Sequence, residues 1–171
     1  GASLVGIEVP NPKPEIVTLR SVMESEAFQS LQSKSKLALA LGRGSGGEVA
    51  VADLGRMPHL LIAGATGSGK SVCMNSVIAC IVMLNSPWET RLLLIDPKRV
   101  ELTPVNGVPH LVAPVIVEVD EVNTALRGLM REMMRRYQLM EESGTRNIDG
   151  YNSKASERMP YLLLIVDELA D

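Results

Sequence analysis

Eight consecutive residues in the first half of the chain have the types and the order that a phosphate-binding loop requires. Residues 64–71 read Gly-Ala-Thr-Gly-Ser-Gly-Lys-Ser and match the pattern G-x-x-x-x-G-K-[ST] at every fixed position. Glycines let the backbone curl so that successive N–H groups converge on an anion, and a helix that follows adds a partial positive charge. The pattern predicts that Lys70 reaches the β- and γ-phosphates of a nucleotide and that the Ser71 hydroxyl binds Mg²⁺. The residues expected to bind the nucleotide are Gly64, Ala65, Thr66, Gly67, Ser68, Gly69, Lys70 and Ser71.

Two acidic residues far along the chain could supply the other half of such a site. The apolar run 161–166 precedes Asp167 and Glu168, as expected for a buried strand that carries the pair at its carboxyl end. We expect Asp167 to hold Mg²⁺, directly or through water, together with Ser71. Glu168 would polarise an attacking water, so Lys70 and Glu168 are the predicted catalytic residues. The alternative is that the two acids simply end a strand at the surface.

The reaction expected from this pair is ATP hydrolysis. A kinase of small molecules must keep water away from the phosphates, so a carboxylate aimed at water is a liability there. An ATPase that drives motion needs such a group. The Asn/Thr-Lys-x-Asp pattern that reads guanine in GTPases does not occur in the sequence.

The loop and the acids can meet only if parallel strands bring them to one edge of a sheet. The apolar run 59–63 predicts the strand before the loop, and neither Gly nor Pro interrupts a helix between Lys70 and Pro87. The runs 91–96, 115–117 and 161–166 predict further strands, the first and last of them buried. The sequence therefore predicts an α/β fold with a largely parallel sheet flanked by helices.

The first part of the chain is predicted to be a lead-in to this fold. Short strands are expected at 5–9 and 16–19, with a proline-rich break at 10–14 and a weak helix from residue 25. The runs 37–41 and 48–52 then flank a glycine-rich loop and predict a β-hairpin. That loop is followed by neither a lysine nor a helix, so a second phosphate cradle is the less favoured interpretation.

The longest helix is predicted to begin with Asp120 as its N-cap and to end at Gly144. Apolar residues at spacings of three and four form one stripe along it: Val122, Leu126, Leu129, Met133, Tyr137 and Met140. The opposite side carries four arginines: Arg127, Arg131, Arg135 and Arg136. Two interpretations of these arginines stay open. They form either a solvated face balanced by Glu132 and Glu141, or a stripe that faces another subunit or a polyanion.

The composition fits one soluble globular domain with a sizeable core. The 171 residues are 46% hydrophobic, and the net charge of −3 limits any nucleic-acid contact to a local patch or to parts outside this sequence. Cys73 and Cys80 are seven residues apart on the predicted helix, too far to bridge, and core packing is favoured over metal binding or redox chemistry. Neither a secretory signal nor an 18-residue apolar run occurs, so a cytoplasmic location is expected.

Several blocks of the sequence resemble the FtsK/SpoIIIE DNA translocases. The blocks that carry the resemblance are 57–71, Ile95-Asp96-Pro97-Lys98, Gly107-Val108-Pro109-His110-Leu111, 132–137 and Val166-Asp167-Glu168-Leu169-Ala170-Asp171. The likeness covers residues 29–171, which would be the N-terminal portion of that family's ATPase motor. Residues 1–28 resemble the linker from a preceding small domain. His59 and His110 lie inside these blocks, and the residues themselves indicate only a structural role for them.

The resemblance implies a RecA-like P-loop NTPase that binds ATP and Mg²⁺ and forms a hexameric ring on double-stranded DNA. It implies work in chromosome partition at cell division, with a possible membrane tether, in the cytoplasm or at the cytoplasmic face of the inner membrane. Lys70, Ser71, Asp167 and Glu168 match the family's Walker residues.

The sequence also departs from the family. The family's motor continues past the Asp-Glu strand with a further core strand, a sensor segment, an arginine finger and a DNA-reading domain. We therefore expect a fold truncated after that strand and weak ATPase activity in this segment alone. Two alternatives are an ATPase of a type VII-like secretion or conjugation system, which moves protein or single-stranded DNA, and a nucleotide-binding module without hydrolysis.

Overall fold

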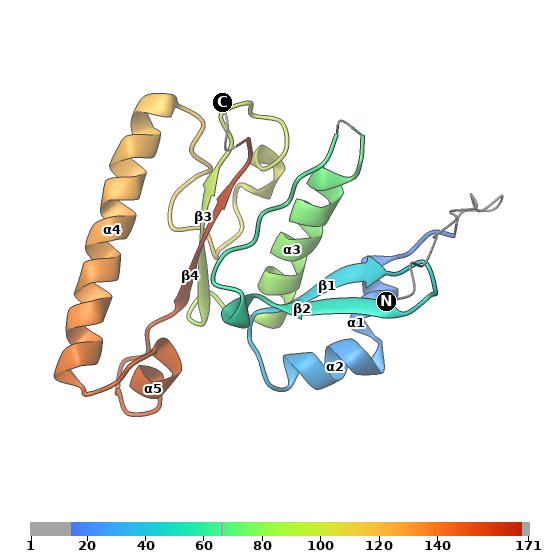
Figure 1. Ribbon diagram of the computed structural model, residues 1–171. Coiled ribbons are helices and arrows are strands. Elements are labelled where there is room, and N and C mark those ends of the chain that lie inside the picture. The colour runs from blue at the N-terminus through green and yellow to red at the C-terminus, as the bar shows by residue number, and fades with distance from the viewer. Residues whose placement is uncertain (1–14, 66, 169–171) are drawn as a thin grey trace, which may run out of the picture.

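The computed structural model describes residues 15–65 and 67–168 of the chain. The strands expected at 5–9 and the proline-rich break lie outside these residues, as does Thr66. Figure 1 shows the arrangement of the elements. In chain order they are α1 (Leu19–Met23), α2 (Glu26–Gln32), β1 (Ala38–Arg43), β2 (Val49–Asp53), the 3-10 helix η1 (Leu54–Arg56), α3 (Lys70–Leu84), β3 (Thr90–Ile95), the 3-10 helix η2 (Thr103–Val105), α4 (Val119–Glu142), α5 (Ile148–Asn152) and β4 (Tyr161–Val166).

The centre of the fold is a parallel pair of strands, β3 and β4. They are in register from Thr90 beside Tyr161 to Ile95 beside Val166. Isolated parallel bridges from Leu92 to Leu111 and from Ile95 to Ile116 add backbone pairing to β3. The expected strand at 115–117 is therefore present only as a single bridge. Because parallel strands end at the same edge, the carboxyl ends of β3 and β4 lie next to each other.

Helices cover both faces of this pair, as Figure 1 shows with α3 on one side and α4 on the other. Successive side chains of a strand point to opposite faces. Leu92 and Leu94 accordingly share a buried cluster with residues of α3, whereas Leu93 and Ile95 pack against Val122 and Ala125 of α4. The prediction of an α/β layer structure with helices flanking a parallel sheet is confirmed.

Helix α3 packs between the parallel strand pair and the β-hairpin. Its buried residues are Met74, Val77, Ile78, Cys80 and Ile81. The Cys80 thiol is buried and its sulfur accepts the Ala40 amide at 3.4 Å, while burial raises the pKa of that thiol. Cys73 and Cys80 are both free, as predicted from their spacing.

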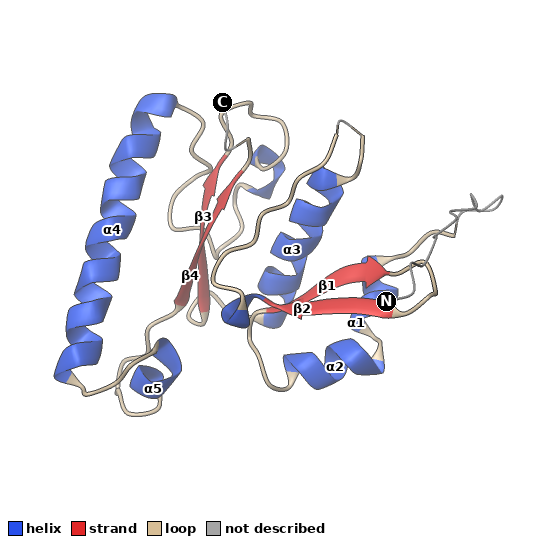
Figure 2. Cartoon of the chain, in the orientation of Figure 1, coloured by secondary structure: helices blue, strands red, loops and turns tan. Residues whose placement is uncertain are grey.

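The hairpin predicted around the glycine-rich loop is present, whereas the strand predicted at 16–19 is wrong. Strands β1 and β2 pair antiparallel with a bulge between Ala40 and Gly42, and Figure 2 shows them apart from the parallel pair. In place of the strand, α1 begins at Leu19 because the Thr18 hydroxyl accepts the Ser21 amide as an N-cap. Val22 and Phe28 pack fully buried in the same core as β1 and α3. The division of the chain at residue 28 stays a prediction.

The strand predicted at 59–63 is also absent. These residues form an extended segment that pairs with no other strand in the described part of the chain, and Leu61 is 78% exposed. A strand requires a neighbour for its amides and carbonyls. Within the described residues β4 pairs with β3 alone, so its other edge does not reach this segment.

Helix α4 packs on the sheet through Val122 and Ala125, near its start. It begins two residues earlier than predicted, with Glu118 and not Asp120 as N-cap, and Asp120 instead places its negative charge in the first turn. None of its residues is fully buried, and Met133 and Tyr137 of the predicted apolar stripe remain 44% and 58% exposed. Gly144 follows its end with φ 62°, in agreement with the predicted stop.

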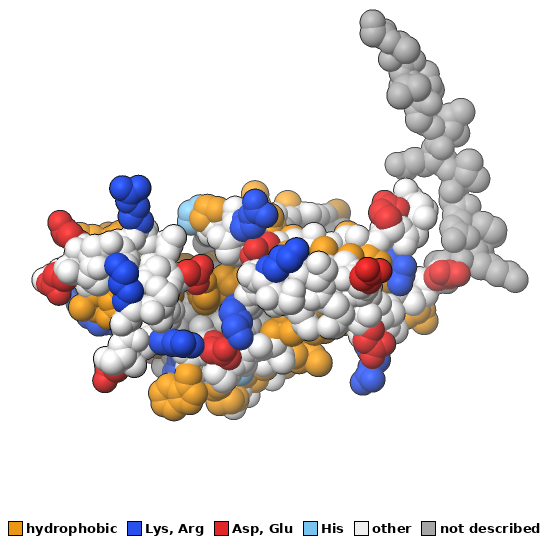
Figure 3. All heavy atoms as spheres, turned by 90° about the horizontal axis from the view of Figure 1, so that it is seen from below, with side chains coloured by type: hydrophobic (Ala, Val, Ile, Leu, Met, Phe, Trp, Pro, Cys, Tyr) orange, Lys and Arg blue, Asp and Glu red, His pale blue; other side chains and the backbone are white. Residues whose placement is uncertain are grey.

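Two of the four arginines on α4 are paired with the same glutamate. Arg135 and Arg136 both donate to Glu132, and Arg136 also donates to the Pro160 carbonyl at 2.7 Å, so this part of the face is locally balanced. Figure 3 shows acidic and basic side chains interspersed over the face of the molecule in view. In the described part of the chain, no helix is long and apolar enough to cross a membrane.

Candidate nucleotide-binding site

The phosphate-binding loop has the backbone shape that its glycines allow. Gly67 and Gly69 have φ values of 79° and 97°, in the region that glycine adopts most easily. A side chain at Gly64 would lie 2.1 Å from the Ser68 hydroxyl oxygen, so only glycine fits there without a shift. The Ser68 amide closes the turn onto the Ala65 carbonyl at 3.0 Å. Thr66, the remaining variable position of the motif, lies outside the described residues.

Helix α3 begins at Lys70, as predicted. Its N-cap is Gly69, which has no side chain to satisfy the first amides, and its first turn contains no acidic residue. The N–H groups at this end are therefore left for another acceptor, and the helix dipole adds positive charge there. These features fit the phosphates of a nucleotide.

Lys70 meets Asp167 and Glu168, which lie 97 and 98 residues further along the sequence. Lys70 Nζ lies 2.9 Å from Asp167 Oδ1 and 2.9 Å from Glu168 Oε1. The Asp167 amide donates to the Ile95 carbonyl at 3.0 Å, which extends the pairing of β4 by one residue and fixes the acid at the sheet edge. Asp167 is buried and Glu168 half-buried, with Glu168 in the left-handed region at φ 57°. The loop and the acids thus form one site.

The electrostatics of the site depend on this contact. Hydrogen bonds to Asp167 and then to Glu168 raise the pKa of Lys70 well above its usual range. The ammonium is therefore protonated at any physiological pH. Ser71 lies in the first turn of α3 directly after Lys70, and its hydroxyl with the Asp167 carboxylate is the donor set that Mg²⁺ prefers when phosphates complete the shell. Among the described residues, no cluster of three His, Cys, Asp or Glu side chains could hold a metal by itself.

Two residues beside the site were not singled out for it from the sequence. Lys98 follows β3, and its Nζ lies 3.6 Å from Glu168 Oε1. Asp96 is fully buried at the start of the same turn, where its Oδ2 accepts the amides of Glu101 and Leu102 at 3.0 and 2.8 Å. Burial opposes the charge of Asp96, but backbone amides outweigh it and lower the pKa of that carboxyl. The signal that could have found both is their position at the carboxyl end of a predicted buried strand, where open parallel sheets bind ligands.

The two histidines lie away from the site chemistry. His110 is buried and its Nε2 lies 2.7 Å from the Asn85 carbonyl, which gives the residue the structural role expected from the sequence. His59 is exposed on the extended segment before the loop. Neither ring contributes to the contact between Lys70 and the two acids.

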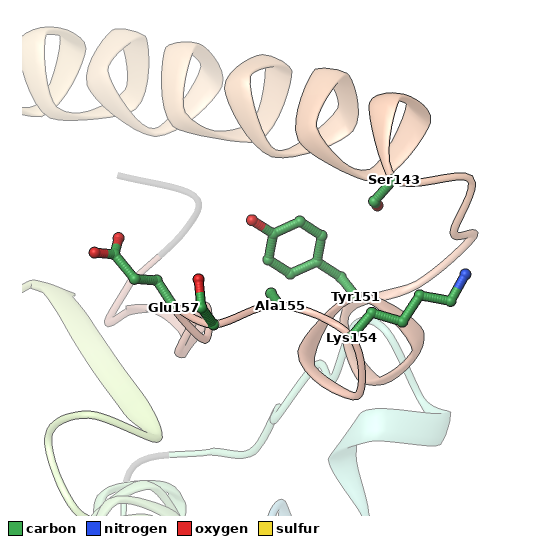
Figure 4. A pocket seen from close by; sticks show the side chains of 6 residues that line it. Ser143, Tyr151, Lys154, Ala155 and Glu157 are labelled. Carbon is green, nitrogen blue, oxygen red and sulfur yellow. The ribbon is translucent and has the colours of Figure 1, made fainter.

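A separate hollow of about 310 Å³ lies near the amino end of β4, beside α5 and the end of α4 (Figure 4). Figure 4 shows the Tyr151 ring projecting into it below the last turns of α4. The hollow is lined by Ser143, Tyr151, Lys154, Ala155, Ser156 and Glu157. It has no glycine loop or helix N-terminus, and it lies at the opposite end of β4 from Asp167. The predicted nucleotide site is therefore elsewhere.

Known proteins share both the sequence and the fold of this chain. The sequence model of the FtsK/SpoIIIE family matches residues 18–164. DNA translocase FtsK of Bacillus cereus is 50% identical over 181 aligned residues, which cover 100% of this chain and 23% of the relative. DNA translocase SpoIIIE of Bacillus subtilis is 46% identical with the same coverage. The chain therefore spans about a quarter of the length of these relatives.

A solved structure has the same fold as this chain over most of its length. The pCW3 conjugation coupling protein TcpA, in its monomer form with ATPγS, superposes with a TM-score of 0.66 at 30% identity. The superposition covers 80% of this chain and 37% of TcpA. The predicted RecA-like P-loop fold is confirmed.

Proposed function

We infer that this chain, which belongs to the FtsK/SpoIIIE family, is the ATP-binding part of a motor that moves double-stranded DNA. The relatives that it matches are named DNA translocases, and it spans 23% of their length. The observation that carries the proposal is the contact of Lys70 with Asp167 and Glu168 at the edge of the sheet. That contact supports the proposal because it brings Lys70 together with Asp167, the proposed metal ligand, and Glu168, the proposed base.

We propose the following roles for the site residues. The backbone amides of residues 64–71 hold the phosphates of ATP, and Lys70 contacts the β- and γ-phosphates. Ser71 and Asp167 hold Mg²⁺, which neutralises charge on the phosphates when it is bound. Glu168 accepts a proton from the attacking water as general base. A triphosphate in the loop competes with the two carboxylates for the Lys70 ammonium, so ATP binding rearranges this contact.

The wider biology is proposed from the family. The complete protein would act as a homo-oligomer, in the family a hexameric ring, around double-stranded DNA during chromosome partition and cell division. A membrane tether outside this sequence would place it at the cytoplasmic face of the inner membrane, and without one it would be cytoplasmic. Residues 29–171 would form the N-terminal portion of the motor and residues 1–28 its linker. The acidic net charge of −3 supports DNA contact through the assembled ring and not through this surface as a whole.

Sequence identity favours DNA translocation over the alternative of secretion or conjugation. The relatives named DNA translocase are 46% and 50% identical over all of this chain. The conjugation coupling protein TcpA is 30% identical over 80% of it. The shared fold alone does not separate these functions, because one fold hosts several activities.

The test is ATP hydrolysis by the full-length protein with and without double-stranded DNA. We expect double-stranded DNA to stimulate turnover more than single-stranded DNA of the same length and sequence. Turnover that no DNA stimulates would refute the translocase assignment. Stimulation by single-stranded DNA alone would favour the conjugation-type alternative.

A further inference from the structure

We propose that Lys98 is a positioning residue that holds the Glu168 carboxylate in place for attack by water. The proposal rests on the proposed function, because it assumes that Glu168 acts as the base. The two residues come from neighbouring parallel strands, Lys98 from the turn after β3 and Glu168 from the end of β4. Their charged atoms, Lys98 Nζ and Glu168 Oε1, lie 3.6 Å apart.

Lys98 and Lys70 approach the same carboxylate oxygen. Lys70 Nζ lies 2.9 Å from Glu168 Oε1, and it is also 2.9 Å from Asp167. In the proposed reaction Lys70 must turn to the phosphates, so it cannot hold Glu168 at the same time. Lys98 lies outside the phosphate-binding loop and keeps its place beside Glu168 when Lys70 moves. It is therefore the cation suited to orient the base during turnover.

The backbone that carries Lys98 is fixed by the buried Asp96. The Asp96 side chain accepts two amides from residues 101 and 102, and its carbonyl accepts the Arg99 amide at 3.1 Å. The Asp96 amide in turn donates to the Ile116 carbonyl at 2.8 Å, which ties the turn to the sheet. Arg99 is held in the left-handed region at φ 58° and pairs with Glu118. A turn with this many bonds places Lys98 reproducibly at the carboxyl end of β4.

Half-exposure of Lys98 makes a substitution there informative. Its side chain is 51% exposed, so Lys98→Met removes the charge without opening a cavity in the core. The same chain offers a matched control in Lys36, which is 58% exposed and pairs with Glu89 at 2.9 Å. Glu89 immediately precedes β3, so this second lysine–glutamate pair lies at the opposite end of that strand from the site.

The test compares ATP hydrolysis by the full-length protein and its Lys98→Met, Lys98→Arg and Lys36→Met variants over a range of ATP concentrations. A displaced base costs rate and not ground-state binding, so Lys98→Met should lower kcat roughly 10-fold to 100-fold with an unchanged KM for ATP. Lys98→Arg should restore most of the rate, and Lys36→Met should match the unaltered protein. In a Glu168→Gln background, Lys98→Met should cause no further loss, because Lys98 acts through Glu168.

Several results would overturn the proposal. An increase in KM with kcat unchanged would mean that Lys98 binds the nucleotide itself. A further loss of rate in the Glu168→Gln background would mean that it acts independently of Glu168. Equal turnover of Lys98→Met and the unaltered protein would refute this inference alone. Absence of ATP turnover in the unaltered protein would refute the proposed function, and this inference with it.

Discussion

Replacement of Gly69 by alanine tests whether the loop needs its observed backbone shape to bind phosphate. Gly69 is the N-cap of α3, with φ 97° and ψ 14°. A Cβ at this position would meet no atom within 4 Å, so the substitution changes backbone energy and not packing. Any loss in the Gly69→Ala variant therefore reports on the left-handed conformation itself.

The size of the effect follows from that conformation. A residue other than glycine in the left-handed region costs about 1–2 kcal/mol. If the loop relaxes to an ordinary φ, ATP binding must restore the strained shape, and affinity falls roughly 5-fold to 30-fold. If the loop stays strained, affinity is retained and the start of α3 opens more readily by the same free energy. The two losses together should amount to about 1–2 kcal/mol.

Two measurements on the full-length protein capture both losses. Fluorescence titration with an ATP analogue gives the affinity, and hydrogen exchange of the α3 amides gives the free energy of local opening. The control is Gly128→Ala in the interior of α4, where φ is not positive and an added Cβ meets nothing within 4 Å. That variant should bind ATP normally and stabilise α4 by about 1 kcal/mol. Unchanged affinity and unchanged exchange in Gly69→Ala would refute the reasoning.

Three further predictions concern the turn after β3, the core around β1 and the pairing of Glu89 with Lys36. Asp96→Ala removes the carboxylate that accepts two backbone amides and should lower the stability of the turn after β3 by about 3 kcal/mol, seen as faster amide exchange at residues 101 and 102. Phe28→Ala should cost about 3–5 kcal/mol, because the ring is fully buried against the β1 core; exchange in β1 left unchanged would show that α2 lies outside that folded unit. The Ser86 amide first, and then Lys36 and the Ser86 hydroxyl, lower the pKa of Glu89 from 4.5 to about 2. The stability from this partly exposed pair, at most about 1 kcal/mol, is therefore fully present above pH 4.5 and lost as the pH falls towards 2. In urea denaturation the difference between Glu89→Gln and the unaltered protein should be largest above pH 4.5 and should shrink as the pH falls towards 2.

Elements whose signals are local were predicted from the sequence alone. Helix α3 was expected to begin at Lys70, as it does, and strands β3 and β4 were expected within about a residue of their observed ends, because uninterrupted apolar runs and helix-compatible stretches encode them directly. The contact of Lys70 with Asp167 also follows from the sequence once both are placed at one edge of a parallel sheet.

Features that depend on spatial neighbours were not predicted. The segment 59–63 has the composition of a strand, but among the described residues nothing pairs with it. At 16–19 a short apolar run suits either a strand or a helix, and the Thr18 cap and burial of Val22 decide for the helix. The contact of Lys98 with Glu168 depends on the register of β3 with β4, which the sequence does not state.

The most direct test of the account compares ATP binding with ATP hydrolysis in Lys70→Ala and Glu168→Gln variants of the full-length protein. In the proposed mechanism Lys70 contacts the phosphates and Glu168 acts on the attacking water at the same bound nucleotide. We therefore expect Lys70→Ala to lose ATP binding, and Glu168→Gln to bind ATP while its turnover falls roughly 10²-fold to 10⁴-fold. Turnover of Glu168→Gln at the rate of the unaltered protein would contradict the account.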